Sequence, residues 1–348
     1  MATSPVPAVT RWGLLGAGQI SRTQSMVLPA ASGAEMFAVA ARDLDRAREL
    51  GAPRAYGSYA ELIDDPEVDA VYVGLANDAH LPWVVAALEA GKTVLCEKPM
   101  GLTAAEVATM AAASARTGSL LVEASWYRWH PRTQLAERML RDGTVGPVTS
   151  VSAGFSFGGV APGNFRLDPA KGGGALYDIG CYALSGVLLA VGDGLPEEVT
   201  AKAERSETGV DLTADVLLTW ASGTTAEVHV SMAEPERQWL VARGERGEIE
   251  LDAPAFTASW GAPAMLLVSD GRGTERIEVA AADPYKLMFE QTSSRSRGED
   301  GWVLPLQDSL ETAAVIDAAL ASAADGSATV TPTLPTTSQG GPHERVQH

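Results

Sequence analysis

The chain has 348 residues, of which 46% are hydrophobic and 20% are charged, a composition typical of globular proteins. Its 26 Lys and Arg residues stand against 44 Asp and Glu residues, and the formal net charge of -18 argues against nucleic acid or an anionic membrane as a partner. A small-molecule substrate fits better, and the length favours two domains.

Membrane, secretion and metal signals are all weak in this sequence. The start, Met1 to Thr10, lacks the basic residues and apolar run of a secretory signal, and no stretch approaches the roughly 18 uninterrupted apolar residues of a membrane span. Cys96 and Cys181 are the only cysteines, and the five histidines have no metal-ligand spacing. We therefore expect a cytoplasmic protein without a metal.

The first 125 residues alternate short apolar runs with helical patterns. This order is typical of parallel strands joined by crossover helices, so it predicts an α/β domain of the doubly wound type over residues 1–125. One alanine-rich helix is expected over Trp83–Ala90, with Gly91 at its C-terminal cap. The expected strands are Trp12–Leu15, Met36–Ala40, Ala70–Gly74, Thr93–Cys96 and Leu120–Glu123.

A glycine turn follows the first strand. Gly16 and Gly18 match the first two glycines of the dinucleotide-binding pattern, where one allows the tight turn and the other lets phosphate approach the backbone. Gln19 and Ile20 follow as further cofactor-binding candidates, and Ser21 stands where the third glycine is usual. The alternative is an ordinary turn between a strand and a helix.

The second strand ends at Ala40 and is followed by Arg42 and Asp43. A guanidinium at this point can bind a 2′-phosphate with two hydrogen bonds and stack on adenine, so NADP is favoured over NAD. In the alternative interpretation Arg42 is a solvated charge at a helix start and Asp43 is the helix N-cap.

Two further candidates follow the strand that ends at Gly74. Asn77 and His80 are expected near the ribose or the nicotinamide of the cofactor, because ligands bind at the carboxyl ends of parallel strands. Capping or packing of the next helix is the alternative for both residues.

The strand Thr93–Cys96 runs into Glu97, Lys98 and Pro99. This places an ammonium group at the carboxyl end of a strand, flanked by an acid and restricted by a proline. Lys98 is therefore the first candidate for a catalytic residue, and Glu97 and Lys98 are both expected at the cofactor site. A surface lysine paired with Glu97 is the alternative.

The pattern changes after Trp126 and predicts an α+β domain over residues 126–332, with a large, mostly antiparallel open sheet that binds substrate. The polar segment Thr292–Gly301 is expected to be a loop. Residues 333–348 are rich in Pro, Thr, Ser and Gly and are expected to be disordered. The expected elements are helices at Thr133–Arg141 and Pro305–Ala324 and strands at Thr213–Trp220, Thr224–Ser231, Trp239–Arg243 and Glu248–Leu251.

A long helix is expected after the glycine run at residues 172–174. Asp178 and Tyr182 lie four residues apart in it and would share one face. A phenol titrates near pH 10 (roughly), and a nearby lysine ammonium is expected to lower that pKa toward a range useful for proton exchange. Taken alone, Tyr182 is also compatible with a packing role.

Together these segments resemble the Gfo/Idh/MocA family of oxidoreductases. The most specific of the matching stretches runs from Ala90 to Pro99. The resemblance implies a Rossmann domain, a second domain whose open sheet forms homodimer or homotetramer contacts, a sugar or cyclitol substrate, and Lys98 as the catalytic lysine. Tyr182 stands where many members have histidine, as in the branch with glucose-fructose oxidoreductase, xylose dehydrogenase and dimeric dihydrodiol dehydrogenase.

In that branch the tyrosine exchanges the hydroxyl proton, so the resemblance implies the same role for Tyr182. Lys98 would hold the hydroxyl and Asp178 would orient the substrate or the lysine. Arg128, Asn164 and Arg166 are further candidates for binding substrate, with structural ion pairs as the alternative for the two arginines. Two other functions stay open: a glycosidase that oxidises and re-reduces its sugar, and a protein that senses NADP without catalysis.

Overall fold

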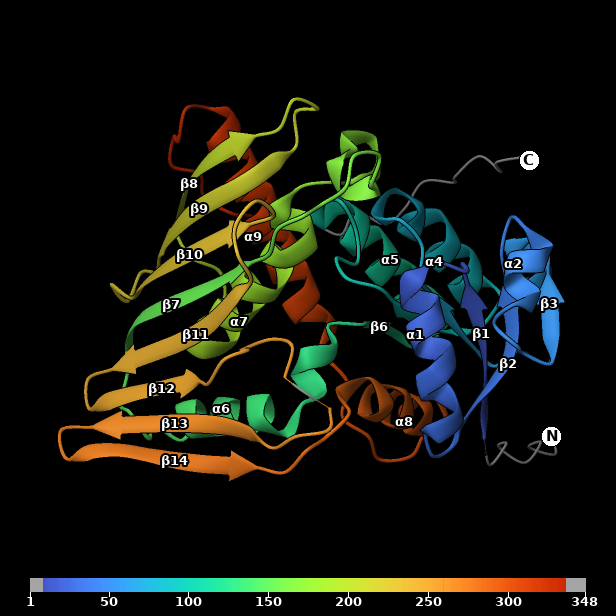
Figure 1. Ribbon diagram of the computed structural model, residues 1–348, viewed down its shortest axis with the longest axis horizontal. Coiled ribbons are helices and arrows are strands. Elements are labelled where there is room, and N and C mark those ends of the chain that lie inside the picture. Colours follow the sequence, from blue (N-terminus) through green and yellow to red (C-terminus); the bar gives the residue numbers. More distant parts are fainter. Residues whose placement is uncertain (1–8, 259, 336–348) are drawn as a thin grey trace.

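The computed structural model describes residues 9–258 and 260–335. Figure 1 shows two sheets, a smaller one near the N-terminus and a larger one formed by later strands, with helices lying between them. Most of the tail predicted to be disordered lies outside the described residues. The expectation of a Rossmann sheet followed by a large, mostly antiparallel sheet is confirmed.

The first sheet is parallel throughout. Its central strands, such as Ala70–Val73, are buried on both faces and are therefore uninterrupted apolar runs. The chain passes from β1 outward to β3 and then returns to β4, so the strand order reverses between β1 and β4, where such sheets hold ligands. In spatial order the strands are β3 (Arg54–Tyr56), β2 (Ala34–Ala40), β1 (Thr10–Leu15), β4 (Ala70–Val73), β5 (Thr93–Cys96) and β6 (Leu121–Glu123).

Crossover helices join these strands, as predicted. Gly91 adopts the left-handed φ of 77° directly after the helix that it was expected to end. The side chain of Thr103 caps the longest of these helices, and Gly118, with φ of 74°, ends it. The helices are α1 (Gln19–Val27), α2 (Leu44–Arg48), α3 (Tyr59–Asp64), α4 (His80–Glu89) and α5 (Ala104–Thr117).

The second sheet is antiparallel except where β10 runs parallel to β7. Its helices lie on one face only, while none of the described helices covers the opposite face (Figure 1). In spatial order the strands are β14 (Gly273–Val279), β13 (Ala264–Asp270), β12 (Gly247–Leu251), β11 (Arg237–Gly244), β7 (Val148–Ser156), β10 (Thr225–Ser231), β9 (Asp211–Thr219) and β8 (Glu198–Arg205).

The helices of the second half are α6 (Pro131–Arg141), α7 (Cys181–Val191), α8 (Pro284–Ser296) and α9 (Leu306–Ala324). Short helical turns precede and connect them, namely η3 (Trp126–Trp129), η4 (Phe165–Leu167), η5 (Pro169–Lys171) and the π-helical turn η6 (Leu176–Gly180). Helix α9 packs against helix α5 of the first sheet and against α7 and β8 of the second, so it joins the two parts of the molecule.

One expected loop is a helix. Residues 292–296 of the polar segment Thr292–Gly301 form the end of α8, and only the residues after Ser296 are non-helical. Thr292 and Ser293 are fully buried, and the Ser293 hydroxyl accepts a hydrogen bond from the Trp12 indole at 2.9 Å. The prediction was wrong because this polar segment is buried against the first sheet, where the Ser293 hydroxyl is paired with Trp12.

The segment Pro169–Val191 is apolar and long enough to resemble a membrane span by length and composition. In the structure, however, 83% of its most apolar window is buried inside the protein, as is normal for a core helix. Among the described residues no group of three or more His, Cys, Asp or Glu side chains could hold a metal ion.

Candidate active site

The glycine turn after β1 has the geometry that a dinucleotide needs. Gly16 has φ of 100°, and a Cβ there would lie 2.7 Å from the Gly74 carbonyl oxygen, so the protein itself requires glycine. A Cβ on Gly18 would meet no protein atom within 4 Å. The backbone at Gly18 is thus open to the approach of a phosphate group.

Gly18 is also the N-cap of α1, and no side chain in the described chain caps that helix. The first N–H groups of a helix have no partner within it, so Gln19 and Ile20 offer their amides to an anion. These donors fit the pyrophosphate of a dinucleotide.

Ser21 stands at the third glycine position of the pattern, where glycine normally allows close packing of helix and strand. Its side chain is fully buried, and a Cβ on Gly74 of the neighbouring strand would lie 2.8 Å from the Ser21 hydroxyl oxygen. Gly74 therefore provides the room that the third glycine usually provides, which explains how the substitution is accommodated.

Arg42 is exposed directly after β2, and it forms no hydrogen bond or ion pair within the described chain. Asp43 caps α2 by accepting hydrogen bonds from the amides of Asp45 and Arg46. The capping interpretation of Asp43 is therefore confirmed, while the Arg42 guanidinium stays available to a ligand. Arg46 was not among the predicted site residues. Its guanidinium donates to the Ala17 carbonyl at 2.9 Å and supports the glycine turn.

Asn77 and His80 connect loops of the site to one another. The Asn77 amide donates to the Gly172 carbonyl at 2.9 Å. The buried His80 ring lies 3.0 Å through Nδ1 from the Pro99 carbonyl oxygen and 3.3 Å through Nε2 from that of Leu75. Burial lowers the pKa of His80. Both side chains thus hold the segments around Lys98 and the glycine run in place.

Glu97 points into the protein. One carboxylate oxygen accepts from the Tyr72 hydroxyl and the other accepts from the Lys98 amide at 3.1 Å. Burial raises the pKa of Glu97, although the Lys98 charge and these hydrogen bonds oppose the effect. Both oxygens have internal partners, so Glu97 orients the backbone of Lys98.

The Lys98 side chain crosses from the first sheet to the second half of the chain. Its Nζ donates to the Asp178 carbonyl at 2.7 Å, lies 3.4 Å from an Asp178 carboxylate oxygen, and sits 5.0 Å from the centre of the Tyr182 ring. Burial alone would lower the pKa of Lys98, but the nearby negative charges, that of Asp178 foremost, together outweigh burial and the pKa is raised. Lys98 is therefore a fixed cation.

Asp178 lies in the π-helical turn η6 and forms ion pairs with two cations. The Arg166 guanidinium donates to it at 2.6 Å, opposite Lys98. Burial by itself would raise the pKa of Asp178, yet the charges of Lys98 and Arg166 lower it. The carboxylate is thus ionised and orients both cations.

Tyr182 is buried at the start of α7, and its hydroxyl oxygen accepts a hydrogen bond from Trp126 Nε1 at 2.7 Å. The expected fall in its pKa is wrong for this structure. Burial raises the pKa of Tyr182 well above its ordinary value, although the hydrogen bond from Trp126 opposes this. Lys98 faces the ring of Tyr182, not its oxygen, so Tyr182 stands as a protonated phenol.

The turn that carries Asp178 is fixed by Asp211 at the start of β9. The Asp211 carboxylate accepts from the Leu176 amide at 2.7 Å, and a Cβ on Gly174, which has φ of 121°, would collide with it. Burial raises the pKa of Asp211 to about 6. Sequence patterns gave no sign of this contact, because the two partners are 35 residues apart.

Four of the predicted residues meet in one cavity of about 350 Å³, which is a volume suited to a small ligand. They are Lys98, Arg166, Asp178 and Tyr182. The remaining lining residues are Phe155, Phe157, Ile179, Glu236 and Thr257.

Arg128 does not reach this cavity, contrary to the expected substrate contact. Its buried guanidinium pairs with Asp308 at 3.0 Å and with Glu137 at 3.7 Å, so the alternative of a structural ion pair is confirmed. The pairing follows from burial, since a buried charge needs an opposite charge nearby.

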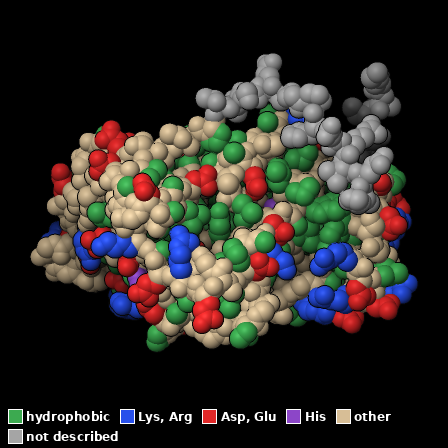
Figure 2. All heavy atoms as spheres, turned by 90° about the horizontal axis from the view of Figure 1, so that it is seen from above, with side chains coloured by type: hydrophobic (Ala, Val, Ile, Leu, Met, Phe, Trp, Pro, Cys, Tyr) green, Lys and Arg blue, Asp and Glu red, His purple; other side chains and the backbone are tan. Residues whose placement is uncertain are grey.

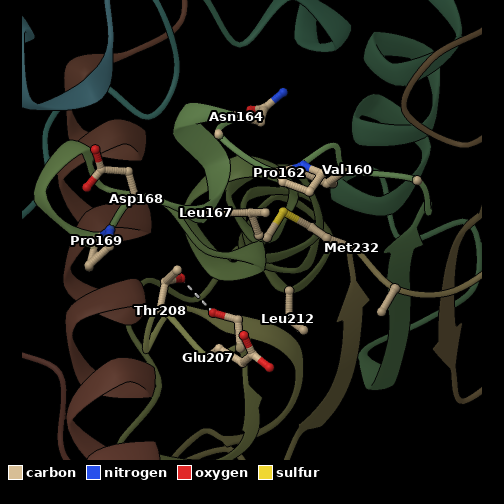
Figure 3. A pocket seen from close by; sticks show the side chains of 14 residues that line it. Val160, Pro162, Asn164, Leu167, Asp168, Pro169, Glu207, Thr208, Leu212 and Met232 are labelled. Atoms are coloured by element: carbon tan, nitrogen blue, oxygen red, sulfur yellow. Dashed lines mark hydrogen bonds between the residues drawn. The ribbon is translucent and has the colours of Figure 1, made fainter.

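Asn164 also lies outside the Lys98 cavity. Its side chain accepts from the Arg166 amide at 3.0 Å and caps η4. It lines a different cavity of about 710 Å³, where its amide points away from Leu212 and Met232 (Figure 3). Asn164 therefore shapes the turn that presents Arg166.

Charges on the surface are mixed. On the face drawn in Figure 2, Lys and Arg side chains alternate with Asp and Glu and with hydrophobic side chains. No continuous basic area is visible among the described residues on that face, in line with the acidic net charge.

A glycine turn at a strand-order reversal, facing a lysine, a carboxylate and a phenol, defines a dinucleotide-dependent oxidoreductase. The comparisons with known proteins agree. A family model described as an oxidoreductase family with an NAD-binding Rossmann fold matches residues 10–125, and the model for the Gfo/Idh/MocA C-terminal domain matches residues 133–250. The chain belongs to the Gfo/Idh/MocA family and is an NAD(P)-binding oxidoreductase.

Two relatives extend over most of the chain. A D-xylose 1-dehydrogenase (NADP(+)) of Haloferax volcanii is 36% identical over 328 residues, which are 91% of this chain and 98% of the relative. A trans-1,2-dihydrobenzene-1,2-diol dehydrogenase of Sus scrofa is 38% identical over 252 residues, covering 71% of this chain and 75% of that protein.

Solved structures show the same fold. A 3-ketoreductase from Actinomadura kijaniata, in complex with NADP and TDP-benzene, superimposes with a TM-score of 0.80 at 28% identity, covering 90% of this chain and 97% of that one. An aldose-aldose oxidoreductase from Caulobacter crescentus with glycerol gives a TM-score of 0.83 at 26% identity, covering 93% and 99% of the two chains.

Proposed function

We propose that the protein transfers a hydride between NADP and the carbinol or carbonyl carbon of a sugar, a cyclitol or a related polyol. The observation that carries the proposal is the shared cavity of Lys98, Asp178 and Tyr182, which combines a fixed cation with a protonated phenol. Asp178 already neutralises part of the positive charge of Lys98 and Arg166, so this cavity suits uncharged hydroxyl compounds.

The cofactor supplies the hydride chemistry at its nicotinamide ring. The chain supplies the amides at the start of α1 for the pyrophosphate and the exposed Arg42 for a 2′-phosphate. Arg42 supports NADP over NAD, and the NADP-dependent relative from Haloferax volcanii points the same way.

Lys98 serves as the donor that holds the reacting oxygen. Its ammonium donates to the Asp178 carbonyl and, at 3.4 Å, to the Asp178 carboxylate, and a lysine has three donors, so one stays available to a hydroxyl or carbonyl oxygen of the substrate. Asp178 keeps this ammonium charged and in place, and Arg166 holds the carboxylate from the other side.

Tyr182 exchanges the proton. In reduction the phenol gives its proton to the carbonyl oxygen, and in oxidation the phenolate takes the proton of the substrate hydroxyl. The raised pKa of Tyr182 favours the protonated phenol in the enzyme without ligands. The Trp126 N–H already occupies one side of the oxygen, so the phenolic hydrogen is free to point toward another acceptor.

The experiment is to incubate the purified protein with NADP or NAD and a panel of aldoses, inositols and dihydrodiols, and to follow the absorbance of reduced nicotinamide. We expect turnover with NADP on one of these carbinol classes. Demonstrable NADP binding without turnover of any member, in either direction, would contradict the proposal.

We also propose that the chain forms a homodimer or homotetramer in the cytoplasm through the second sheet. The support is the uncovered face of that sheet, which carries the half-exposed side chain of Leu217. Light scattering coupled to gel filtration tests the subunit number, and a monomer at micromolar concentration would contradict it.

A further inference from the structure

A second cavity adjoins the one that holds Lys98. Its volume is about 500 Å³, and Thr257 lines both cavities, so the two spaces meet at this residue. The other lining residues are Trp126, Ala258, Trp260, Gly261 and Tyr285. None of the lining side chains carries a charge at neutral pH.

The walls of this second cavity are aromatic. The rings of Trp126 and Tyr285 stack with centroids 4.6 Å apart at 22°, and Trp260 meets Tyr285 edge-on at 5.5 Å. Trp126 and Tyr285 are buried, whereas 43% of Trp260 is exposed. The exposed indole of Trp260 therefore leaves an apolar face open to a ligand that enters this cavity.

The loop that separates the two cavities is held by a buried arginine. Arg132 donates to the carbonyl oxygens of Asp252 at 2.7 Å, Pro254 at 2.9 Å and Ala255 at 2.6 Å. Burial lowers the pKa of Arg132 to about 10, so it stays charged at neutral pH. Within the described chain its guanidinium forms no ion pair, and both of its terminal nitrogens donate to this loop.

A glutamine fixes the same loop from the other side. Gln238 accepts from the amides of Phe256 and Thr257 at 2.9 and 3.0 Å, and it donates to the Thr257 hydroxyl at 2.6 Å. Thr257 therefore has a fixed position between the cavities, and the shape of the wall is set before a ligand binds.

We infer that the cavity of Trp126, Trp260 and Tyr285 binds a second, neutral ring of the substrate, an aryl group or another sugar ring attached to the ring that reacts beside Lys98. Flat apolar faces stack on indole and phenol rings, and none of the lining residues is a cation that would pair with a phosphate or carboxylate. The inference rests on the proposed function, because it assigns the reacting ring to the Lys98 cavity.

The position of the second ring follows from one hydrogen bond. Trp126 lines the aromatic cavity with its ring and donates through Nε1 to the Tyr182 hydroxyl. A ring that packs against Trp126 is thus one side chain away from the proton donor, which is the separation expected of two linked rings.

Binding of paired glycosides tests the inference. Methyl and phenyl β-D-glucoside, and methyl and phenyl β-D-xyloside, are titrated into the NADP-saturated protein by calorimetry. Trp260→Ala removes one wall, Trp260→Phe keeps an aromatic ring, and Met26→Ala removes another exposed apolar side chain, 72% exposed, at the end of α1.

We expect the wild type to bind the phenyl member of at least one pair roughly tenfold more tightly than the methyl member, the size of one added ring contact. Trp260→Ala should abolish this preference, whereas Trp260→Phe and Met26→Ala should keep most of it. The affinity for the methyl glycoside should be the same in all four proteins.

Two results would overturn the inference. One is the absence of a phenyl preference in every pair, and the other is a loss of NADP binding in Trp260→Ala, which would assign the cavity to the nicotinamide. If the wild type reduces NADP with simple sugars but shows no phenyl preference, the second-ring site fails and the proposed function stands. If no carbinol substrate turns over at all, the proposed function itself fails.

Discussion

The indole Nε1 of Trp126 donates a hydrogen bond of 2.7 Å to the hydroxyl oxygen of Tyr182, across 56 residues of sequence. Trp126 follows the last strand of the first sheet, and Tyr182 begins α7 beside the second sheet. The bond therefore connects the part of the chain that binds the cofactor to the proposed proton donor. It also places an N–H where negative charge develops when the phenol loses its proton.

Trp126→Phe keeps an aromatic ring in the stack with Tyr285 and removes this N–H together with part of the indole. We expect kcat to fall roughly 10- to 100-fold, the value of a hydrogen bond to a charged oxygen, with little change in KM. The pKa of Tyr182 seen in the pH dependence of kcat should rise, because the phenolate loses a donor. Steady-state rates of the oxidation from pH 6 to 10 test this, because kcat should rise with pH across that range and be lower in the variant at every pH. An unchanged kcat would speak against the positioning role.

Lys98→Met removes the ammonium that faces both Asp178 and Tyr182. We expect kcat/KM to fall roughly a hundredfold or more, because the reacting oxygen loses its charged donor. The matched control is Lys202→Met, which removes an exposed lysine of β8 and should retain wild-type activity. Comparable activity of the Lys98 and Lys202 variants would exclude Lys98 from catalysis.

Arg42→Ala should change the preference for the cofactor and not the chemistry. Loss of a charged contact to the 2′-phosphate should raise KM for NADP roughly tenfold or more and leave KM for NAD nearly unchanged. Arg48→Ala, an exposed arginine at the end of α2 that pairs with Asp45, is the control. Equal changes in KM for NADP and for NAD would show that Arg42 does not bind the 2′-phosphate.

The buried carboxyl of Asp211 predicts a dependence of stability on pH. Its pKa is about 6 in the fold against 3.8 for an ordinary aspartate, so its contribution is greatest below about pH 4 and is lost as the pH rises through 6. The shift corresponds to roughly 3 kcal/mol. The side chain in Asp211→Asn still accepts from Leu176 but cannot ionise. As the pH rises from 4 to 7, the free energy of unfolding of the variant should therefore increase relative to that of the wild type, by up to that amount. Urea titrations measure the difference, and parallel pH curves would refute it.

Most of the first sheet could be predicted because its signals are local. The glycine turn, the run Thr93–Cys96 and the charged residue after β2 each depend on a few neighbouring residues, and the strand Thr93–Cys96 has the expected bounds. Strands β13 and β14 were not predicted, since β13 is a short apolar run without alternation and most positions of β14 are polar and exposed. Strands β7 and β8 were missed as well, so the predicted open sheet lacked half of its strands.

The site was only partly predictable for a related reason. Lys98, Asp178 and Tyr182 stand in recognisable motifs, but the partners that determine their behaviour come from distant segments. Trp126 and Asp211 were not among the candidates, because their roles arise from contacts formed by folding. Arg128, in contrast, was a candidate for binding substrate but pairs with Asp308 instead. Nothing near Arg128 in the sequence indicates this pairing.

Isotope transfer tests hydride transfer most directly. A substrate identified in the panel is prepared with deuterium on the reacting carbinol carbon and mixed with NADP and the protein, and the nucleotide is analysed by mass spectrometry. We expect deuterium in the reduced nucleotide with the wild type and at least a hundredfold slower labelling with Tyr182→Phe. Substrate consumption with the deuterium retained in the product and no net reduction of NADP would contradict the account and favour a redox-cycling glycosidase.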